Sequence, residues 1–300
     1  MLTIAREPWP DLDLLQDGVR ALAEAARHEV RPNDLEARDA SFLRRVEPLL
    51  GLLYDFYFRC ETELEQELPA GRFLGVANHN AMTGMPDMFC HMIAFWRRYG
   101  TERPSYGLMH DVPFRFPFAG AWLNAAGAIA ANPANARRAL DRDAAVLCFP
   151  GGDLDACKPY SKRYSIEFGR RRGFVRLAIR EQVPIVPIVS VGAHSGLYIW
   201  TDGKAIAELL RLPALARSNV APIGVAMPWG IIFGVPYPHV PPPVKIHTRI
   251  LRPIRFDVPP DAADDPGEVE RGFLRVLAAM TDAMDDLRRA KNHGLFPRPR

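Results

Sequence analysis

Short apolar runs alternate with segments of helical periodicity over most of the chain beyond residue 69. The runs FLGVA, AAVLCF and VPIVPIVSV contain almost no polar residue, which is typical of strands buried on both faces of a parallel sheet. Between such runs, apolar residues recur at intervals of three and four, the period of an amphipathic helix. This alternation predicts an α/β fold, with a mixed, mostly parallel sheet flanked by helices.

The predicted elements follow one another in strand-helix order. Strands are expected at 73–77, 106–109, 126–130, 144–149 and 183–191, and helices from residue 88 and at 116–124, 135–141, 173–181 and 268–289. The stretch 221–238 is the longest without charge, but its prolines interrupt a continuous helix. We therefore expect strands and an apolar loop there and no membrane-spanning helix.

The first 68 residues are predicted to form a helical segment that precedes the α/β domain at 69–300. Helical spacing is seen at 12–28 and at 41–59, with Ser41 as the candidate N-cap of the second helix. The apolar stripe of that helix is wider than one face. It therefore either packs on the domain, which is the default expectation, or lies on a membrane surface.

Composition and charge add little to this picture. The 300 residues are 48% hydrophobic and 24% charged, with a net charge of +3, which gives no reason to expect a nucleic-acid partner. Four cysteines, Cys60, Cys90, Cys148 and Cys157, form no CxxC pair, so we expect buried or free thiols in a reducing compartment. Charged residues near the N-terminus argue against a signal peptide, and a cytoplasmic location is expected.

The end of the first predicted strand carries the first candidate chemistry. Asn78-His79-Asn80 follow the strand, and Asp87 opens the next helix. Catalytic groups are common at this edge of an α/β sheet. A histidine there can act as a general base, with a carboxylate that holds its tautomer. Two simpler interpretations remain, in which Asp87 only caps its helix and His79 only bonds to the backbone of the turn.

A second candidate site follows the strand at 144–149. Paired glycines in the sequence Phe149-Pro150-Gly151-Gly152-Asp153 would let a ligand approach backbone N–H groups closely, although a plain turn has the same composition. Downstream, basic residues far outnumber the single acid, Glu167; they are Lys158, Lys162, Arg163, Arg170, Arg171, Arg172, Arg176 and Arg180. The last two fit a solvated helix face, whereas the others suit an anionic ligand.

The order of these motifs resembles the lysophospholipid and glycerolipid acyltransferase family, over residues 58–255. Residues 68–74, which lead into the first predicted strand, also resemble the segment that precedes the histidine motif in that family. In the family, the histidine is the general base, the aspartate orients it, and a Phe-Pro-x-Gly loop lies in the acceptor or headgroup site. The resemblance thus implies His79 as base, Asp87 as orienting residue and Phe149, Pro150, Gly151 and Gly152 as the loop. We further assign Asn78, Asp153, Lys158, Lys162, Arg163 and Arg171 to substrate binding.

Three features depart from the family pattern. The usual His-x4-Asp spacing places Gly84 where an aspartate is expected, and Asp87 comes three residues later. Gly151 stands where the family's Phe-Pro-Glu-Gly has glutamate, similar to the variant of neutral-lipid acyltransferases. The segment 127–132 lacks the arginine that would bind an acceptor phosphate, for which Arg137 or the basic cluster could substitute.

The resemblance implies acyl transfer from acyl-CoA or an acyl carrier protein to a lipid hydroxyl, with no metal or other cofactor. The expected partners are acyl-CoA, a lipid acceptor and a membrane surface, contacted through segments 49–58 and 229–235 at the mouth of the pocket. One alternative is a non-catalytic lipid-binding module, which the altered spacing favours. The other is a hydrolase or metal enzyme that uses His79, Asp87, Asp153, Asp155 and His194, although their spacing in the sequence is not that of a compact metal site.

Overall fold

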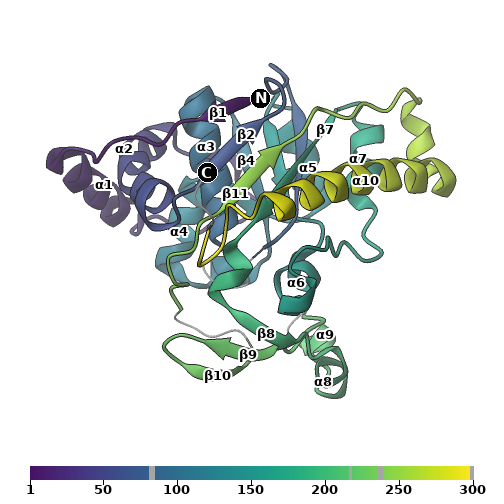
Figure 1. Cartoon of the computed structure of the whole chain (residues 1–300). Helices are drawn as coiled ribbons and strands as arrows, with labels where there is room; N and C mark the ends of the chain where they lie inside the picture. The colour runs from purple at the N-terminus through teal and green to yellow at the C-terminus, as the bar shows by residue number, and fades with distance from the viewer. Residues whose placement is uncertain (81–84, 216–217, 235–238, 298–300) are drawn as a thin grey trace.

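The apolar runs form one mixed, eight-stranded sheet (Figure 1). The structure is a computed structural model that describes residues 1–80, 85–215, 218–234 and 239–297. Across the sheet the strands are β1 (Leu2–Ile4), β2 (Glu61–Leu64), β11 (His247–Ile250), β7 (Ile185–Val191), β3 (Phe73–Ala77), β6 (Ala145–Cys148), β4 (Ser105–Met109) and β5 (Ala128–Ala130). The five strands from β7 to β5 are parallel, whereas β11 is antiparallel to β7 and β1 to β2. The predicted α/β class is confirmed.

Helices cover both faces of this sheet. One face packs against α1 (Leu12–Ala25), α2 (Ala40–Leu52) and α3 (Pro86–Tyr99), and the other against α5 (Pro133–Leu140), α7 (Gly173–Arg180) and α10 (Pro266–Ala290). Side chains of β3 alternate between the two cores: Leu74 and Val76 face α7 and α10, and Phe73 and Ala77 face α3. This alternation explains why the run FLGVA is apolar throughout, since both of its faces are buried.

The remaining elements lie mainly at the carboxyl edge of the parallel strands. A second sheet, in the order β10 (Gly230–Phe233), β9 (Ile223–Ala226) and β8 (Tyr198–Thr201), occupies the lower part of Figure 1. Shorter helices are α4 (Pro117–Ala125), α6 (Gly152–Ala156), α8 (Lys204–Leu209) and α9 (Leu212–Leu215). The strands expected within 221–238 are thus β9 and β10, and residues 235–238 lie outside the described part of the chain. No helix in the described ranges is long and apolar enough to cross a membrane.

The N-terminal segment contains more than the predicted helices. Both helices are present, but β1 and β2 were not predicted, and they pair with the main sheet through β11. Asp39, not Ser41, caps α2, because its carboxylate accepts the backbone N–H groups of Ser41 and Phe42. The division of the chain at residue 68 stays a prediction.

The expectation of four unpaired thiols is wrong for two of the cysteines. Cys60, next to β2, and Cys90, in α3, form a disulfide, so a covalent bond ties the N-terminal segment to the helix that follows β3. Cys148 and Cys157 are free and buried, as expected, and burial raises the pKa of Cys148 to about 12. Burial also raises the pKa of Cys157, so neither thiol is ionised near neutral pH.

Candidate active site

His79 and Asp87 meet at the carboxyl end of β3. His79 Nδ1 lies 3.3 Å from Asp87 Oδ2, and both side chains are buried. The same carboxylate oxygen accepts the backbone N–H of Asn80 at 2.9 Å. Asp87 stands in the first turn of α3, but its side chain makes no cap bond to that helix. The interpretation of Asp87 as a plain N-cap is therefore wrong, and the two side chains lie together despite the unusual spacing.

The surroundings keep Asp87 ionised. Complete burial alone would raise its pKa, but the hydrogen bond and charge interaction with His79, and the bond from the Asn80 amide, hold the pKa below its ordinary value. A second histidine of α3, His91, is also buried, and burial lowers its pKa to about 4. His91 is therefore neutral at pH 7 and adds no positive charge to the site.

Two asparagines fix the turn that carries His79. Asn78 donates to the backbone oxygen of Ser190 in β7 at 3.0 Å and accepts the Ser190 N–H at 2.8 Å. Asn80 donates to Ser190 Oγ at 2.8 Å and accepts the backbone N–H of His194 at 3.2 Å. The side-chain amides of Asn78 and Asn80 both hydrogen-bond to other parts of the protein. Asn78 therefore holds the turn in place. Its assignment to substrate binding is not supported by its position.

A buried ion pair holds the backbone of His79 from the other side. Asp155 Oδ2 accepts the His79 N–H at 2.6 Å, and Asp155 Oδ1 accepts from Lys158 Nζ at 2.6 Å. The same ammonium donates to the backbone oxygens of His79 at 3.2 Å and of Ser165 at 2.7 Å. Lys158 is 1% exposed, and these three bonds use all its donors. Its assignment to a substrate anion is therefore corrected: Lys158 positions His79.

The Phe-Pro-Gly-Gly loop contacts His79 directly. The Phe149 ring stacks on the His79 ring, with centroids 4.1 Å apart and planes 12° from parallel, and the His91 ring lies 6.1 Å away, also near parallel to Phe149. The Phe149 ring therefore lies against both histidine rings.

Gly151 leaves no room for a side chain. A Cβ there would overlap the Cβ of Asp155 and approach the backbone oxygen of Glu167 to 2.9 Å. A glutamate, which the family pattern has at this position, would push into the residue that holds the His79 amide. Gly152 has φ of +47°, a left-handed conformation that favours glycine. Glycine in place of the family's glutamate at position 151 therefore fits the close packing against Asp155.

Arg171 and Asp153 hold this loop from outside. Arg171 Nη1 donates to the backbone oxygens of Pro150 at 3.1 Å and Gly151 at 2.6 Å, and Nη2 pairs with Asp153 at 2.7 Å. Asp153 also accepts two hydrogen bonds from Asn219, and these contacts keep its pKa low although burial acts in the opposite direction. Their role toward a substrate stays a prediction.

The other basic residues do not form one cluster. Lys162 lies 3.5 Å from Glu167, Arg172 pairs with Glu270, and Arg180 pairs with Asp264. Arg137 pairs with Glu181, whose backbone oxygen binds Arg72 just before β3. This is the edge of the sheet opposite His79, so Arg137 is not placed to bind an acceptor phosphate at the site. Arg163 stacks on Tyr160 and Tyr164.

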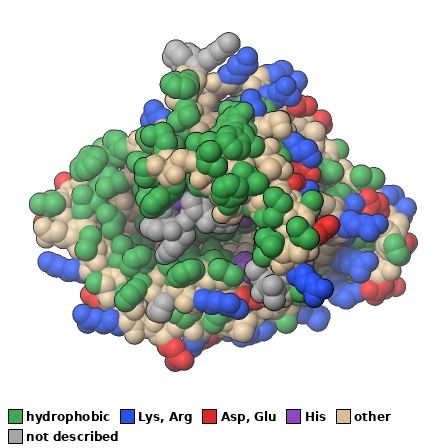
Figure 2. Space-filling view, turned by 90° about the horizontal axis from the view of Figure 1, so that it is seen from below, with side chains coloured by type: hydrophobic (Ala, Val, Ile, Leu, Met, Phe, Trp, Pro, Cys, Tyr) green, Lys and Arg blue, Asp and Glu red, His purple; other side chains and the backbone are tan. Residues whose placement is uncertain are grey.

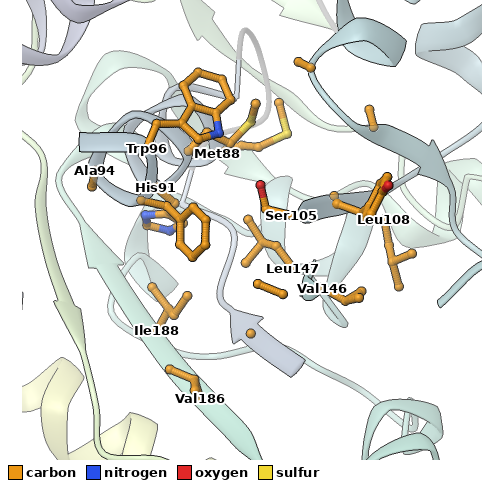
Figure 3. A pocket seen from close by; sticks show the side chains of 18 of the residues that line it. Met88, His91, Ala94, Trp96, Ser105, Leu108, Val146, Leu147, Val186 and Ile188 are labelled. Carbon is orange, nitrogen blue, oxygen red and sulfur yellow. The ribbon is translucent and has the colours of Figure 1, made fainter. Parts of the chain in front are cut away.

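An apolar pocket lies beside His91 and Phe149, between α3 and the sheet (Figure 3). Met88, Ala94 and Trp96 of α3 and Leu147 and Ile188 of the sheet line it, as the figure shows. The cavity volume is about 90 Å³. The lining residues with polar side-chain atoms include His91, Tyr99, Ser105 and Tyr106, and no described residue hydrogen-bonds to either ring nitrogen of His91. A pocket of this composition suits a hydrocarbon chain.

Several residues of the site were missed or misread from the sequence. From the sequence, Asp155 is a candidate only for a metal or hydrolase site, and Ser190 and His91 are not candidates. Asp155 is 76 positions from the amide that it binds, and no local pattern signals such a pairing. In the described part of the chain, no group of three or more His, Cys, Asp and Glu side chains is arranged to hold a metal ion.

The face below the site is largely apolar. Figure 2 shows this face, with hydrophobic side chains gathered around a hollow in which histidine is visible. The small sheet contributes Trp229, Ile231 and Phe233, all exposed, with Phe233 at 79%. Exposed apolar patches of this kind commonly mark sites of interaction with a membrane or another protein.

Comparison with known proteins links this arrangement to acyl transfer. The family model described as "Acyltransferase" matches residues 59–191, which include His79, Asp87 and the loop at 149–152. An uncharacterized protein of Mycobacterium tuberculosis is 28% identical over 246 residues, or 71% of this chain and 68% of its own length. One from Mycobacterium leprae is 28% identical over 199 residues, or 64% and 54%.

A plant protein adds a more distant similarity. Phytyl ester synthase 1, chloroplastic, of Arabidopsis thaliana is 34% identical over 96 residues, which are 32% of this chain and 13% of that protein. No solved structure matches the chain. Together, the family match and the plant relative support an acyltransferase family, and acyl transfer in general, for the segment that carries the site.

Proposed function

We propose that the protein is an O-acyltransferase that moves a fatty acyl group from a thioester donor to a hydroxyl of a lipid, with His79 as the general base. The observation that carries this proposal is the buried His79–Asp87 pair beside an apolar pocket. A base with a fixed tautomer next to space for a hydrocarbon chain is what transfer of a fatty acyl group requires.

In the proposed reaction, the two ring nitrogens of His79 have different tasks. Nδ1 faces the Asp87 carboxylate, which leaves Nε2 to take the proton of the acceptor hydroxyl. The oxygen then attacks the thioester carbonyl, the carbon–sulfur bond breaks, and the leaving thiolate takes the proton back from the imidazolium. Asp87 stabilises that imidazolium while the proton is held. The positive N-terminal end of α3, beside the pair, favours the negative charge that develops on the carbonyl oxygen.

The identity of the acceptor can be tested with purified protein, acyl-CoA and a panel of lipid hydroxyls. We expect thiol release that depends on the acceptor, with diacylglycerol or a long-chain alcohol preferred over a lysophospholipid that bears a phosphate monoester. The segment 127–132 carries no arginine, and Arg137 lies at the far edge of the sheet. Phytol belongs in the panel because of the plant relative's name.

The outcomes of this experiment separate the alternatives. Free fatty acid released without an acceptor would instead favour a hydrolase. Binding of acyl-CoA or lipid with no turnover on any hydroxyl would favour a lipid-binding module. Either result would overturn the proposed acyl transfer.

We further propose that the protein docks on a membrane surface through β10. In the segment 49–58, Tyr54 and Phe58 are buried in the core and only Phe56 is exposed among the large apolar side chains, so the default expectation of packing holds there. In contrast, β10 presents Ile231 and Phe233 to solvent. Of the predicted membrane-contact segment 229–235, the structure describes residues 229–234.

Replacing Ile231 and Phe233 with serine should weaken binding to vesicles of phosphatidylcholine and phosphatidylglycerol by at least about tenfold. Burial of one such side chain contributes about 1.5–3 kcal/mol. Cosedimentation measures the partition, and the pair Val19→Ser and Leu274→Ser, exposed on α1 and α10, is the matched control. If the β10 variant binds vesicles as tightly as the unaltered protein, docking through this strand is wrong.

A further inference from the structure

A histidine in the apolar pocket has no hydrogen-bond partner among the described residues. His91 of α3 lines the pocket and is only 5% exposed, and Figure 3 shows its ring among the apolar side chains there. A buried polar group without a partner lowers the stability of a fold, because it has given up its hydrogen bonds to water. The position of His91 in the pocket therefore needs a reason other than stability.

The other polar residues of the lining differ from His91. Tyr99 Oη donates to the Glu67 carboxylate at 2.9 Å, and Tyr106 Oη donates to a backbone oxygen of the N-terminal segment at 3.2 Å. Ser105 is the first residue of β4, at the amino edge of the parallel strands. These three residues are therefore either committed to protein contacts or far from the proposed base.

His91 lies at the end of the pocket that is next to the proposed base. It follows Asp87 by four residues on α3, which places the two side chains one turn apart on the same face of the helix. The Phe149 ring, which stacks on His79 with centroids 4.1 Å apart, has its centre 6.1 Å from that of the His91 ring. An acyl chain that enters the pocket with its reacting carbon at His79 would therefore pass His91 within its first few carbon atoms.

The chemistry of the His91 ring selects a neutral oxygen. Burial lowers the pKa of His91 to about 4, so the ring is neutral at pH 7, and the charge of Asp87 acts on it and disfavours an anion there. A neutral imidazole has one N–H donor and one acceptor nitrogen. A carbonyl or ether oxygen can bind only the donor, whereas a hydroxyl can accept from the N–H or donate to the other nitrogen. A hydroxyl therefore suits either ring nitrogen, and a methylene chain suits neither.

We propose that His91 binds a hydroxyl group on the acyl chain, near its thioester end, so that the preferred substrate is a hydroxy fatty acyl group. This inference rests on the proposed function and specifies its acyl donor. A hydroxyl loses its water when it enters an apolar pocket, and this cost is offset only where a partner is present. A site with a buried polar group also discriminates against an analogue that leaves that group unpaired. His91 is thus a specificity-determining residue, and the proton transfer stays with His79.

The binding test uses acids of one length that differ only in a hydroxyl. Decanoic, 2-hydroxydecanoic, 3-hydroxydecanoic and 10-hydroxydecanoic acid share the carboxylate, so its contribution cancels when their dissociation constants from isothermal titration are compared. We expect the 2-hydroxy or the 3-hydroxy acid to bind about tenfold more tightly than decanoic acid, and the 10-hydroxy acid to bind no more tightly. His91→Leu should abolish or reverse this preference, because the hydroxyl would then be buried without a partner.

Two further variants separate the hydrogen bond from packing. Met92→Leu changes the next residue of α3, which also lines the pocket, and should leave the ratio of the dissociation constants nearly unchanged, since Met and Leu have similar volumes. His91→Gln keeps a donor and an acceptor and should retain part of the preference. In thermal unfolding without ligand, His91→Leu should be at least as stable as the unaltered protein, because an apolar side chain replaces a group that has no partner.

Kinetics with paired donors provides the second arm. With one acceptor, the value of kcat/KM for the preferred hydroxydecanoyl-CoA relative to decanoyl-CoA should fall about tenfold in His91→Leu, and turnover of decanoyl-CoA should stay similar. A preference for hydroxy acids in binding, with no acyl transfer to any acceptor, would contradict the proposed function but support the role of His91.

Three results would overturn the inference. The first is an unaltered protein that binds decanoic acid as tightly as both the 2-hydroxy and the 3-hydroxy acid. The second is a preference for the hydroxy acids that His91→Leu retains. The third is a His91→Leu protein that no longer folds, since His91 would then be a structural residue.

Discussion

Replacing His79 with glutamine should lower kcat by about 10²- to 10⁴-fold, the usual contribution of a general base. The substitution removes the nitrogen that would take the acceptor proton, while the apolar pocket is left in place. Because the lost interaction is made in the transition state, kcat and kcat/KM should fall together and the affinity for acyl-CoA should stay similar. Thiol release measured at saturating donor and acceptor gives both parameters.

The control for this variant must separate chemistry from folding. His79 is buried between Asp87 and Phe149, so its removal also affects packing, and the thermal unfolding of each variant has to be measured. His28→Gln, at an exposed position, should leave both turnover and unfolding unchanged. Suppose instead that folded His79→Gln turns over within a few-fold of the unaltered protein. His79 would then be a structural residue, and the proposed mechanism would have to be abandoned.

The sequence predicted the central strands well for a physical reason. Strands β3, β6 and β7 are buried on both faces, so each appears as an uninterrupted apolar run. In contrast, β2 and β11 have the sequences ETEL and HTRI, in which charged side chains reach solvent or pair with each other. These short polar strands are recognisable only when their neighbours in the sheet are known, because pairing rather than periodicity defines them.

The candidate site likewise contains some residues that the sequence predicts and others that it does not. Histidine and aspartate at a strand end are visible in the sequence, and the structure brings them within 3.3 Å. The partners that position them come from distant segments: Ser190 binds Asn78 across 112 positions and Asp155 binds His79 across 76. Lys158 was read as a ligand-binding cation because it begins a basic run. The deciding fact, its burial against Asp155, depends on tertiary packing that no spacing rule contains.

Lys158→Met should lower the free energy of unfolding by about 3–5 kcal/mol, the usual result of removing one member of a buried ion pair. Asp155, at 0% exposure, would lose the ammonium that now lies 2.6 Å away. The backbone oxygens of His79 and Ser165 would each lose a donor as well. Urea unfolding followed by circular dichroism measures the change, and Lys162→Met, at an exposed lysine, should stay within about 0.5 kcal/mol of the unaltered protein.

A second substitution shows whether the charge is the cause. Adding Asp155→Asn to Lys158→Met removes the unpaired charge, so the double variant should be more stable than Lys158→Met alone, and the two effects should not add. If the effects are additive, the ion pair is not what holds this region together. The decisive contrary result would be a Lys158→Met protein that unfolds like the unaltered one but shows a raised KM for the acyl donor. Lys158 would then contact the substrate, as the sequence alone suggested, and the positioning role that its hydrogen bonds imply would be wrong.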